Sequence, residues 1–524
     1  MFNSSVDWAY QTEKSEIASK SLKNGVFWPR GKMLGGSGSI NAMLYIRGNS
    51  RDYDEWEKMG NPGWGWDSVL EYFKKSEDVR FDEFATKANG KYHAKGGPLK
   101  VEPFFSYDPL KDMMLEAAQE LGYKMNEDVN AEEFMGYNTC LGTIENGRRV
   151  SPAKAFLSPI KDRKNLHVVK HAQVANIIIN KDGKAEGVHF IIQGTKVMAT
   201  AKKEVILSAG AINSPQILML SGVGPKAHLK KFSIKCKKDL PVGKNLQDHA
   251  IVYVPFKFHK SQAQPIAADE LYDEIYMYLR HKVGKFSHHG TTDLVGFINT
   301  VNKTAQFPDI QFHHFQFRRG EENKLEKFAD QIGYTDEVKK SLMDVLDDSE
   351  LVMVMVTLLK PKSFGKIELN SAYPLDKPLI YGNYLLEQED VDTLVRGIDA
   401  LMPFLGTKTF KEHEGKLHKL NITGCDEHKY HSNAYWKCFV RHTTTTVYHP
   451  TSTCKMGPDT DPEAVVDSRL RVKGIKGLRV IDASIMPLIV SGNTNAPTIM
   501  IGEKGADFIK KDWQEKDSKS HSEL

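Results

Sequence analysis

A glycine-rich segment near the start of the chain, FWPRGKMLGGSGSINAMLYIRG over residues 27–48, constrains the fold more than any other single feature. Gly35, Gly36 and Gly38 remove three closely spaced side chains, which permits positive φ angles and a close approach of the backbone to a ligand. Ser37 and Ser39 suit phosphate binding or the cap of a helix, which the residues 40–45 predict. The spacing matches neither GxGxxG nor the P-loop, so the segment taken alone favours a plain surface turn before a helix.

Length and composition narrow the class of protein. A chain of 524 residues is expected to form two or more domains. It is 40% hydrophobic and 26% charged, as globular domains are. The net charge of +4 arises from 71 basic and 67 acidic residues, a near balance that predicts neither a nucleic acid nor a membrane partner. The longest apolar run, residues 351–359, is too short to cross a bilayer and predicts a buried strand.

The termini and cysteines leave the cellular compartment open. The first sixteen residues are polar and contain no apolar core of a signal peptide. The five cysteines show no CxxC or zinc-finger spacing. Cys425 and Cys438 could pair within one loop, although a reduced pair fits the sequence as well.

Periodicity predicts a mixed architecture. Short apolar runs over residues 165–208 predict strands separated by turns at KDGK and GTK. Residues 108–122 and the charged block 320–350 have helical patterns. The segment GAINSPQILML changes from strand to helix, with Asn213, Ser214 and Pro215 as start signals. The residues after Trp513 form a polar tail that is expected to fray.

Most histidines fit structural roles. His413 and His418 are five residues apart, so they do not share the helical face that a zinc helix requires. The pairs His288–His289 and His313–His314 would point to opposite sides of a strand. We therefore interpret these histidines as structural and predict no metal site, and the absence of GxSxG excludes the serine-hydrolase elbow.

The C-terminal region has a more specific pattern. His449 lies in the hydroxyl-rich segment TTTTVYHPTSTCKMGP, followed by the strand GLRVIDASIMP and the segment SGNTNAPTIMIGEKGAD. Asn495 and Pro497 suit the first turn of a helix whose dipole and free N–H groups would face a bound anion or electron-rich ring. Taken alone, His449 fits a satisfied core histidine equally well.

Together these segments resemble the glucose–methanol–choline (GMC) oxidoreductase family of FAD enzymes. WPRGKMLGGSGSINAMLYIRGN and GAINSPQILMLSGVGP look like its two signatures, and PVGKNLQDH, YHPTSTCKMG, LRVIDASIMP and NTNAPTIMIGEKGAD follow in the family's order. The matches extend from about residue 6 to residue 513. RHTTTTVYHP and CKMG look most similar to the insect glucose dehydrogenase-like branch.

The resemblance implies a mixed α/β (α+β) fold. An FAD-binding dinucleotide-fold domain would be built from discontinuous segments, and a substrate domain would be built on an antiparallel sheet. The implied boundaries are an FAD-domain segment with the signature loop at 1–61, a lid segment at 62–139, a second FAD-domain segment at 140–250, the substrate domain at 251–444, a third FAD-domain segment with the catalytic residues at 445–513, and the polar tail at 514–524.

The resemblance also implies an activity, the oxidation of CH–OH groups of an alcohol or sugar with hydride transfer to flavin N5. His449 would be the general base and Asn493 would orient the substrate oxygen. The helix that opens near Asn495 would stabilise negative charge on the flavin. The implied FAD contacts are Met33, Gly35, Gly36, Asn41, Ala42, Met43, Leu44, Val174 on the adenine side, Asp482, Ala483 and Thr494. FAD would be bound non-covalently, because Ile40 occupies the position at which some members carry a flavin-linked histidine.

The chain departs from the family pattern in two places. It begins after the family's first strand and GxGxxG turn, so we expect a longer form to carry them and this chain to bind FAD poorly. That longer form would be secreted, with Cys425 and Cys438 as its disulfide. Thr451 and Ser452 replace the usual Val-Gly after His-Pro. Without that glycine, the resemblance does not predict the backbone conformation near His449.

Two alternatives remain open. One is a cofactor-free, non-enzymatic relative, and the other is a lyase on the same fold. The expected partners are a small alcohol or sugar and an electron acceptor, quinone or oxygen, with no nucleic acid and no membrane.

Overall fold

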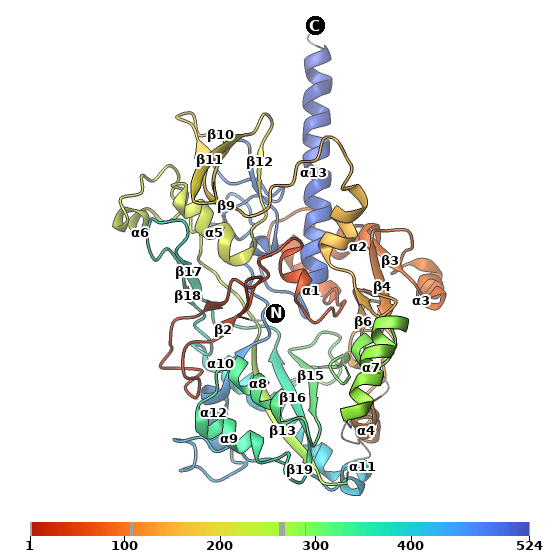
Figure 1. The fold of residues 1–524 in the computed structure, drawn as a ribbon. Helices are drawn as coiled ribbons and strands as arrows, with labels where there is room; N and C mark the ends of the chain where they lie inside the picture. The colour runs from red at the N-terminus through yellow and green to blue at the C-terminus, as the bar shows by residue number, and fades with distance from the viewer. Residues whose placement is uncertain (1–2, 105, 107, 261–267, 289, 523–524) are drawn as a thin grey trace.

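The fold was obtained as a computed structural model that describes residues 3–104, 106, 108–260, 268–288 and 290–522. Helices and sheets are both present, which confirms the predicted mixed α/β class. Figure 1 shows one large sheet at one end of the molecule and a smaller sheet with α5 and α6 at the other. Within the described residues, no helix is both long and apolar enough to cross a membrane.

The large sheet has seven antiparallel strands in the order β19-β13-β16-β15-β14-β5, with β20 also paired to β13. Every residue of β16 is buried, which confirms the buried strand predicted at 351–359. One face packs against α10 (Gln388–Asp399). The strands are β5 (Gly136–Thr139), β13 (Ala250–Phe258), β14 (Leu294–Ile298), β15 (Ile310–Phe317), β16 (Glu350–Leu358), β19 (Gly415–Leu417) and β20 (Thr445–Thr446).

The smaller sheet confirms most of the predicted strands between residues 165 and 208. β9 (Ala172–Ile179), β10 (Ala185–Ile192) and β11 (Thr195–Thr200) form an antiparallel meander, whereas residues 166–170 form no strand. Next to it, β12 (Val205–Leu207) pairs in parallel with β21 (Leu478–Val480).

Helix α5 (Gly210–Leu220) begins earlier than its sequence signals predict. The Gly210 N–H donates to Asp482 Oδ2 over 2.9 Å, and the Ser214 hydroxyl donates to the same oxygen over 2.6 Å. A partner far away in sequence therefore caps this helix, which no local pattern could reveal.

The remaining elements surround these sheets. The helices predicted near residues 108–122 and 320–350 are confirmed as α4, α8 and α9. The helices are α1 (Ser50–Lys58), α2 (Trp66–Ser76), α3 (Asp82–Thr86), α4 (Pro109–Glu120), α6 (Lys226–Lys231), α7 (Ala268–His281), α8 (Glu322–Ile332), α9 (Asp336–Met343), α11 (Lys408–Glu412) and α12 (Asn433–Thr443). The short strands are β1 (Tyr10–Gln11), β2 (Phe27–Trp28), β3 (Glu77–Val79), β4 (Leu99–Pro103), β6 (Leu141–Gly142), β7 (Ile144–Glu145), β8 (Arg148–Arg149), β17 (Lys366–Glu368) and β18 (Leu379–Tyr381).

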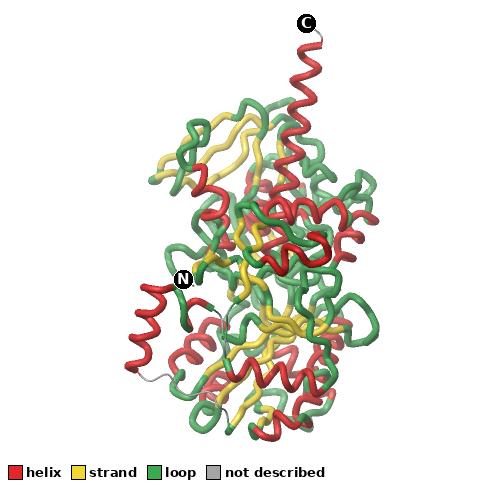
Figure 2. Tube along the Cα trace, turned by 90° about the vertical axis from the view of Figure 1, so that its right-hand side faces the viewer, coloured by secondary structure: helices red, strands yellow, loops and turns green. Residues whose placement is uncertain are grey.

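The C-terminal helix corrects the prediction of a frayed tail. α13 (Asn495–Ser522) continues well beyond Trp513 and projects from the body of the molecule in both views (Figures 1 and 2). The Trp513 indole donates to Glu204 over 2.6 Å, and Arg479 bridges Glu204 and Asp512. These contacts fix the helix at its middle, and the residues that follow include neither glycine nor proline to end it.

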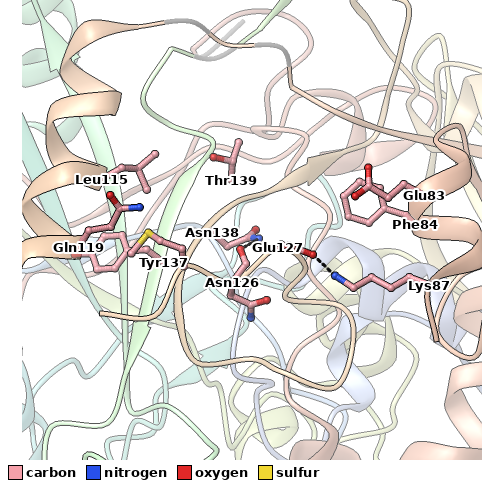
Figure 3. A pocket seen from close by; sticks show the side chains of 11 residues that line it. Glu83, Phe84, Lys87, Leu115, Gln119, Asn126, Glu127, Tyr137, Asn138 and Thr139 are labelled. Atoms are coloured by element: carbon pink, nitrogen blue, oxygen red, sulfur yellow. Dashed lines mark hydrogen bonds and ion pairs between the residues drawn. The ribbon is translucent and has the colours of Figure 1, made fainter. Parts of the chain in front are cut away.

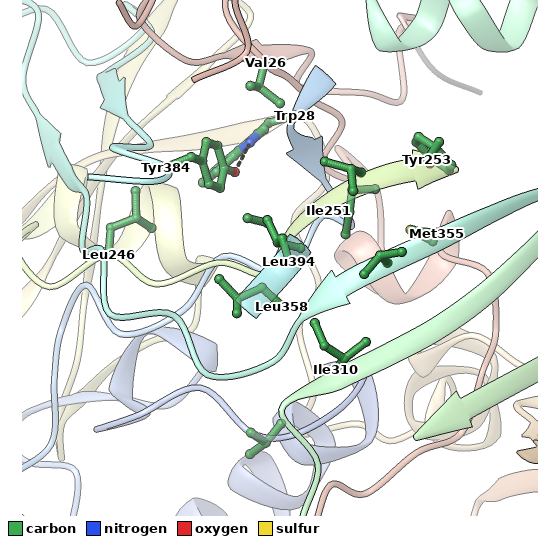
Figure 4. Close-up of a cluster of buried hydrophobic side chains, with 14 of the residues drawn as sticks. Val26, Trp28, Leu246, Ile251, Tyr253, Ile310, Met355, Leu358, Tyr384 and Leu394 are labelled. Carbon is green, nitrogen blue, oxygen red and sulfur yellow. Dashed lines mark hydrogen bonds between the residues drawn. The ribbon is translucent and has the colours of Figure 1, made fainter. Parts of the chain in front are cut away.

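The hydrophobic core beside the large sheet contains the first residues of a hydrogen-bond network that leads to the candidate site. Figure 4 shows Trp28 and Tyr384 among the aliphatic side chains of this cluster, including Ile251 and Leu394. The Trp28 indole donates to the Tyr384 hydroxyl over 3.2 Å. A hydrogen-bond network therefore begins inside the apolar core, where a satisfied polar group is held rigidly.

Candidate active site

A cavity of about 1120 Å³ joins segments from the whole chain. It contains most of the residues singled out in the sequence, and its lining includes Gly35, Gly36, Asn41, Ala42, Met43, Leu44, His449, Asp482, Ala483, Asn493 and Thr494. Two predicted contacts are not part of the lining. The Met33 side chain is 43% exposed beside the glycine loop, and Val174 pairs with Phe190 in the small sheet.

The glycine-rich loop forms one wall, but without the predicted helix. Gly36–Ser39 is a short 3-10 helix, and Gly35 and Gly36 adopt φ angles of 87° and 54°. Residues 40–45 are not helical, because Leu44 instead pairs with Gly142 as an isolated bridge. The prediction of a helix at 40–45 was therefore wrong, and a tertiary backbone pairing is the reason.

Close packing explains why Gly38 has no side chain. A Cβ at this position would lie 2.7 Å from Pro152 Cδ and 3.1 Å from Asn495 Oδ1. The loop thus packs directly on the first residue of α13. The N-terminal N–H groups of α13 lie at the same cavity, because Asn495 and Thr498 line it.

The cavity fits a cofactor as large as FAD. Its volume exceeds the roughly 300–1,000 Å³ usual for sites of drug-sized ligands. Glycine backbone and the starts of α5 and α13 form its walls, and such surfaces suit phosphate groups and an electron-rich ring. The residues that would hold FAD are those of the glycine loop, of the segment 208–213 at the start of α5, and Asp482 and Ala483.

His449 is held by a second histidine. Its Nδ1 lies 2.9 Å from His249 Nδ1, and His249 Nε2 lies 3.1 Å from the carbonyl oxygen of Val490. A carbonyl only accepts, so His249 carries its proton on Nε2 and accepts through Nδ1. His449 must then carry its proton on Nδ1, which leaves the lone pair on its Nε2 as an acceptor.

Asn493 faces that acceptor. Its Nδ2 lies 3.3 Å from His449 Nε2, and its Oδ1 accepts a hydrogen bond from Gln311 Nε2 over 3.2 Å. Gln311 therefore fixes the orientation of the amide, with the donor end toward the imidazole.

Burial keeps His449 neutral. Desolvation lowers its pKa well below the usual value, and the nearby His249, His313 and Arg30 lower it further. Burial also lowers the pKa of His249 to about 3. Both rings are neutral at physiological pH, so His449 Nε2 can accept a proton.

The backbone of His449 is fixed by Asp248. The His449 N–H donates to Asp248 Oδ1 over 2.8 Å, while Oδ2 accepts from Thr446 over 2.5 Å and from the Tyr384 hydroxyl. Burial raises the pKa of Asp248 to about 6. The network from Trp28 through Tyr384 therefore ends at the peptide group of His449.

Ser452, which with Thr451 replaces the Val-Gly of the family pattern, still adopts an unusual backbone conformation near His449. Ser452 has a φ angle of 75°, in the region that favours glycine, and it is fully buried. Its hydroxyl lies 2.9 Å from that of Thr451. The chain therefore adopts a glycine-like turn here without glycine.

Sequence reasoning missed two histidines of the site. His249 ends the motif PVGKNLQDH but received no role. His313 was interpreted as structural, yet it lines the cavity, and its buried Nε2 has no partner within the described residues. Its neighbour His314 donates to the carbonyl of Leu294 and is absent from the lining, and His289 lies outside the described residues. The alternation of side chains along a strand correctly predicted that His313 and His314 lie on opposite faces of the sheet. It could not show which of the two faces lines the cavity.

A second, smaller pocket of about 460 Å³ lies near α3, α4 and β5 (Figure 3). Gln119, Asn126 and Asn138 contribute its amide groups, and Lys87 pairs with Glu127 beside them. It contains none of the predicted site residues, so the larger cavity is the candidate active site.

The two nearby cysteines form a disulfide. Cys425 and Cys438 are bonded, which settles the alternative that the sequence left open. His442 lies with them in a small cluster. The two sulfur atoms are already joined, so the cluster is not a thiolate metal site.

Comparisons with known proteins agree with this geometry. Family models described as GMC oxidoreductase match residues 12–251 and 361–502. A glucose dehydrogenase (FAD, quinone) of Drosophila pseudoobscura pseudoobscura is 39% identical over 97% of this chain and 79% of its own. An ecdysone oxidase of Bombyx mori is 36% identical over 97% of this chain and 74% of its own. The crystal structure of pyridoxine 4-oxidase from Mesorbium loti matches with a TM-score of 0.78 at 26% identity, covering 97% and 89% of the two chains.

The family matches span most of the chain, and the cavity assembles their signature segments around His449 and Asn493. The chain therefore belongs to the GMC oxidoreductase family, FAD-dependent oxidoreductases that act on CH–OH groups of their donors.

Proposed function

We propose that this chain oxidises a small alcohol or sugar, with His449 as the general base and Asn493 as the group that orients the substrate oxygen. The hydrogen bond between His449 and His249 carries this proposal. It places the acceptor lone pair of His449 on Nε2, 3.3 Å from Asn493 Nδ2. A base without such a partner would populate both neutral tautomers and lose part of its competence.

Each residue has a defined task in this reaction. The substrate hydroxyl donates its proton to His449 Nε2, and Asn493 Nδ2 donates a hydrogen bond to the same oxygen. As the alkoxide character develops, that hydrogen bond strengthens, because the acceptor becomes charged. FAD, when bound, supplies the hydride acceptor at N5.

The amide of Asn493 has no titrating proton, so it contributes orientation alone. Gln311 holds its carbonyl end over 3.2 Å. His313 lies on the same face of the sheet as Gln311, with an unpartnered ring nitrogen that suits a second polar group of a substrate. This arrangement favours substrates with more than one hydroxyl.

We propose the same FAD contacts and domain boundaries that the resemblance implies. The cavity lining supports the contacts of the glycine loop and of Asp482, Ala483 and Thr494. Met33 and Val174 do not line the cavity. The variant Met33→Ala tests the proposed contact, because it should lower flavin content only if this side chain touches the cofactor.

The electron acceptor is proposed to be a quinone. The support is the name of the relative that is 39% identical, a glucose dehydrogenase (FAD, quinone). The Cys425–Cys438 disulfide supports a location outside the cytosol, where disulfides persist.

Anaerobic mixing of the flavin-loaded protein with alcohols and sugars tests the proposal. Bleaching of the flavin band that saturates with one substrate class would support it, and rapid reoxidation by a quinone rather than oxygen would support the acceptor. A loaded protein that no alcohol or sugar bleaches would refute the proposal.

A further inference from the structure

The near-balanced net charge conceals a strongly basic part of the chain. Residues 160–244 contain 16 lysines and arginines but 5 aspartates and glutamates, a net charge of +11. Because the whole chain carries +4, the remainder carries −7. The basic part includes β9 to β12 and α6, which lie at the end of the molecule away from the seven-stranded sheet (Figure 1).

Apart from Lys203, these basic residues have no acidic partner within the described part of the chain. Fifteen of the 16 side chains are exposed, and Lys238 is half-buried. Apart from Lys203, which lies over the Trp513 ring, none makes an ion pair within the described residues. Elsewhere lysines commonly pair, as Lys360 does with Asp52. An uncompensated set of this size produces a positive potential over the surface.

Five lysines gather where separate turns meet, and we call Lys184, Lys235, Lys237, Lys238 and Lys476 the lysine cluster. The backbone of Lys184 bridges that of Lys476, and Lys237 Nζ donates to the carbonyl of Ile179 over 3.1 Å. Lys238 Nζ lies 2.9 Å from the point at which a Cβ on Gly474 would stand.

The lowered pKa of Lys237 and the backbone contacts between these turns both indicate that the lysines of the cluster lie close together. Burial lowers the pKa of Lys237, and the neighbouring Lys235 lowers it further. The acids nearest in sequence, Asp182, Glu186 and Asp239, make no ion pair with the cluster within the described residues. Like charges held this close repel, and a bound polyanion would relieve the repulsion.

We propose that the lysine cluster and the basic surface around it bind a linear sulfated polysaccharide. Lysine acts as a point charge that suits sulfate groups along a flexible chain. Arginine, which forms bidentate contacts with bases and phosphates, contributes one of the 16 charges, Arg163.

The other polyanions fit less well. The large apolar side chains exposed in this segment are Val168, Val169, Val197, Met198 and Ile206, with no aromatic ring on which nucleic acid bases could stack. The Cys425–Cys438 disulfide indicates an oxidising compartment, whereas anionic lipids concentrate on the cytoplasmic leaflet. A sulfated polysaccharide is therefore the favoured partner.

Binding of the full chain to immobilised heparin tests this inference. The variant K184Q/K235Q/K237Q/K238Q/K476Q removes the cluster charges, and the matching five Lys→Arg substitutions keep them. A control variant K327Q/K340Q/K411Q/K416Q/K429Q removes the same charge from exposed lysines at the other end. We expect the cluster variant to lose at least about tenfold in heparin affinity at physiological salt, with a shallower salt dependence, because fewer counterions are released.

The Lys→Arg and distant control variants should keep the parent affinity. Equal losses in the cluster and distant variants would overturn the proposal, as would no retention on heparin beyond that on a sulfonate resin of similar charge density. Tighter binding to duplex DNA or to phosphatidylserine vesicles than to heparin would show that the surface prefers another class of polyanion. That result would also overturn the proposal. Circular dichroism of each variant confirms that a lost affinity reflects charge rather than unfolding.

Discussion

The Nδ1 atoms of His249 and His449 lie 2.9 Å apart, so one proton must lie between them. The carbonyl of Val490 accepts a hydrogen bond from His249 Nε2–H and thereby decides which ring donates. His449 donates through Nδ1 and keeps an acceptor lone pair on Nε2. The buried backbone carbonyl of Val490 thus selects the tautomer of the base, and within the described residues no charged side chain is hydrogen-bonded to either ring.

His449→Ala should lower the rate of flavin reduction by about two to four powers of ten, the usual worth of a general base. Asn493→Ala should cost less, because it removes hydrogen bonds but no proton acceptor. Flavin content should stay unchanged in both, since other residues hold the phosphates. Anaerobic stopped-flow with the flavin-loaded protein measures the rates. A His449→Ala protein that retains flavin and reduces it at the parental rate would remove His449 from the mechanism.

His249 should act as a positioning residue. His249→Leu removes the acceptor for His449 Nδ1–H, so the base can take the unproductive tautomer, and kcat should fall about tenfold or more. His249→Gln retains a carbonyl acceptor and should retain more activity. The low-pH limb of the rate profile should also move to higher pH in His249→Leu, because His249 contributes to the lowered pKa of His449. A limb that does not move would reduce His249 to a packing role.

The pH dependence of kcat/KM follows from the same shift. His449 must be unprotonated to act, and its pKa in the folded protein lies well below the ordinary value of 6.5. Activity is therefore retained above the folded pKa and lost as the pH falls through it. We expect kcat/KM to stay level from pH 8 to pH 6.5 and to fall only at lower pH. A half-maximal rate near pH 6.5 would contradict the burial that lowers this pKa.

The sequence predicted those parts of the site whose conformation depends on residues that are neighbours in the chain. The glycine loop, the strand before Asp482 and the helix that opens at Asn495 are each visible as a short motif. His313 was missed because its role depends on which face of the sheet meets the cavity. His249 was missed because its partner, His449, is 200 residues away in the sequence. The start of α5 was also missed, since the carboxylate of Asp482 caps it from a distant segment.

Ser452 offers a test of backbone strain. Its φ angle of 75° is unfavourable for any side chain with a Cβ. Both Ser452→Ala and Ser452→Gly lose the hydroxyl contact with Thr451, but only the glycine relieves the strain. Ser452→Gly should therefore be more stable than Ser452→Ala by about 1 kcal/mol. Urea unfolding of the two variants gives the difference directly, and an alanine variant of equal or higher stability would mean that the turn is unstrained.

The Cys425–Cys438 disulfide closes a loop of sequence separation 13 just before the strand that leads to His449. A closed loop of this length restricts the unfolded chain, so replacing both cysteines with serine should cost about 3 kcal/mol of unfolding free energy. The cavity lining includes neither cysteine, so kcat should not change in the flavin-loaded variant. Cys236→Ser is the matched control, because this partly exposed thiol is free and its loss should leave the stability unchanged. Mass spectrometry of non-reduced peptides should find Cys425 linked to Cys438, and two free thiols there, or equal stability of all three proteins, would contradict the pairing.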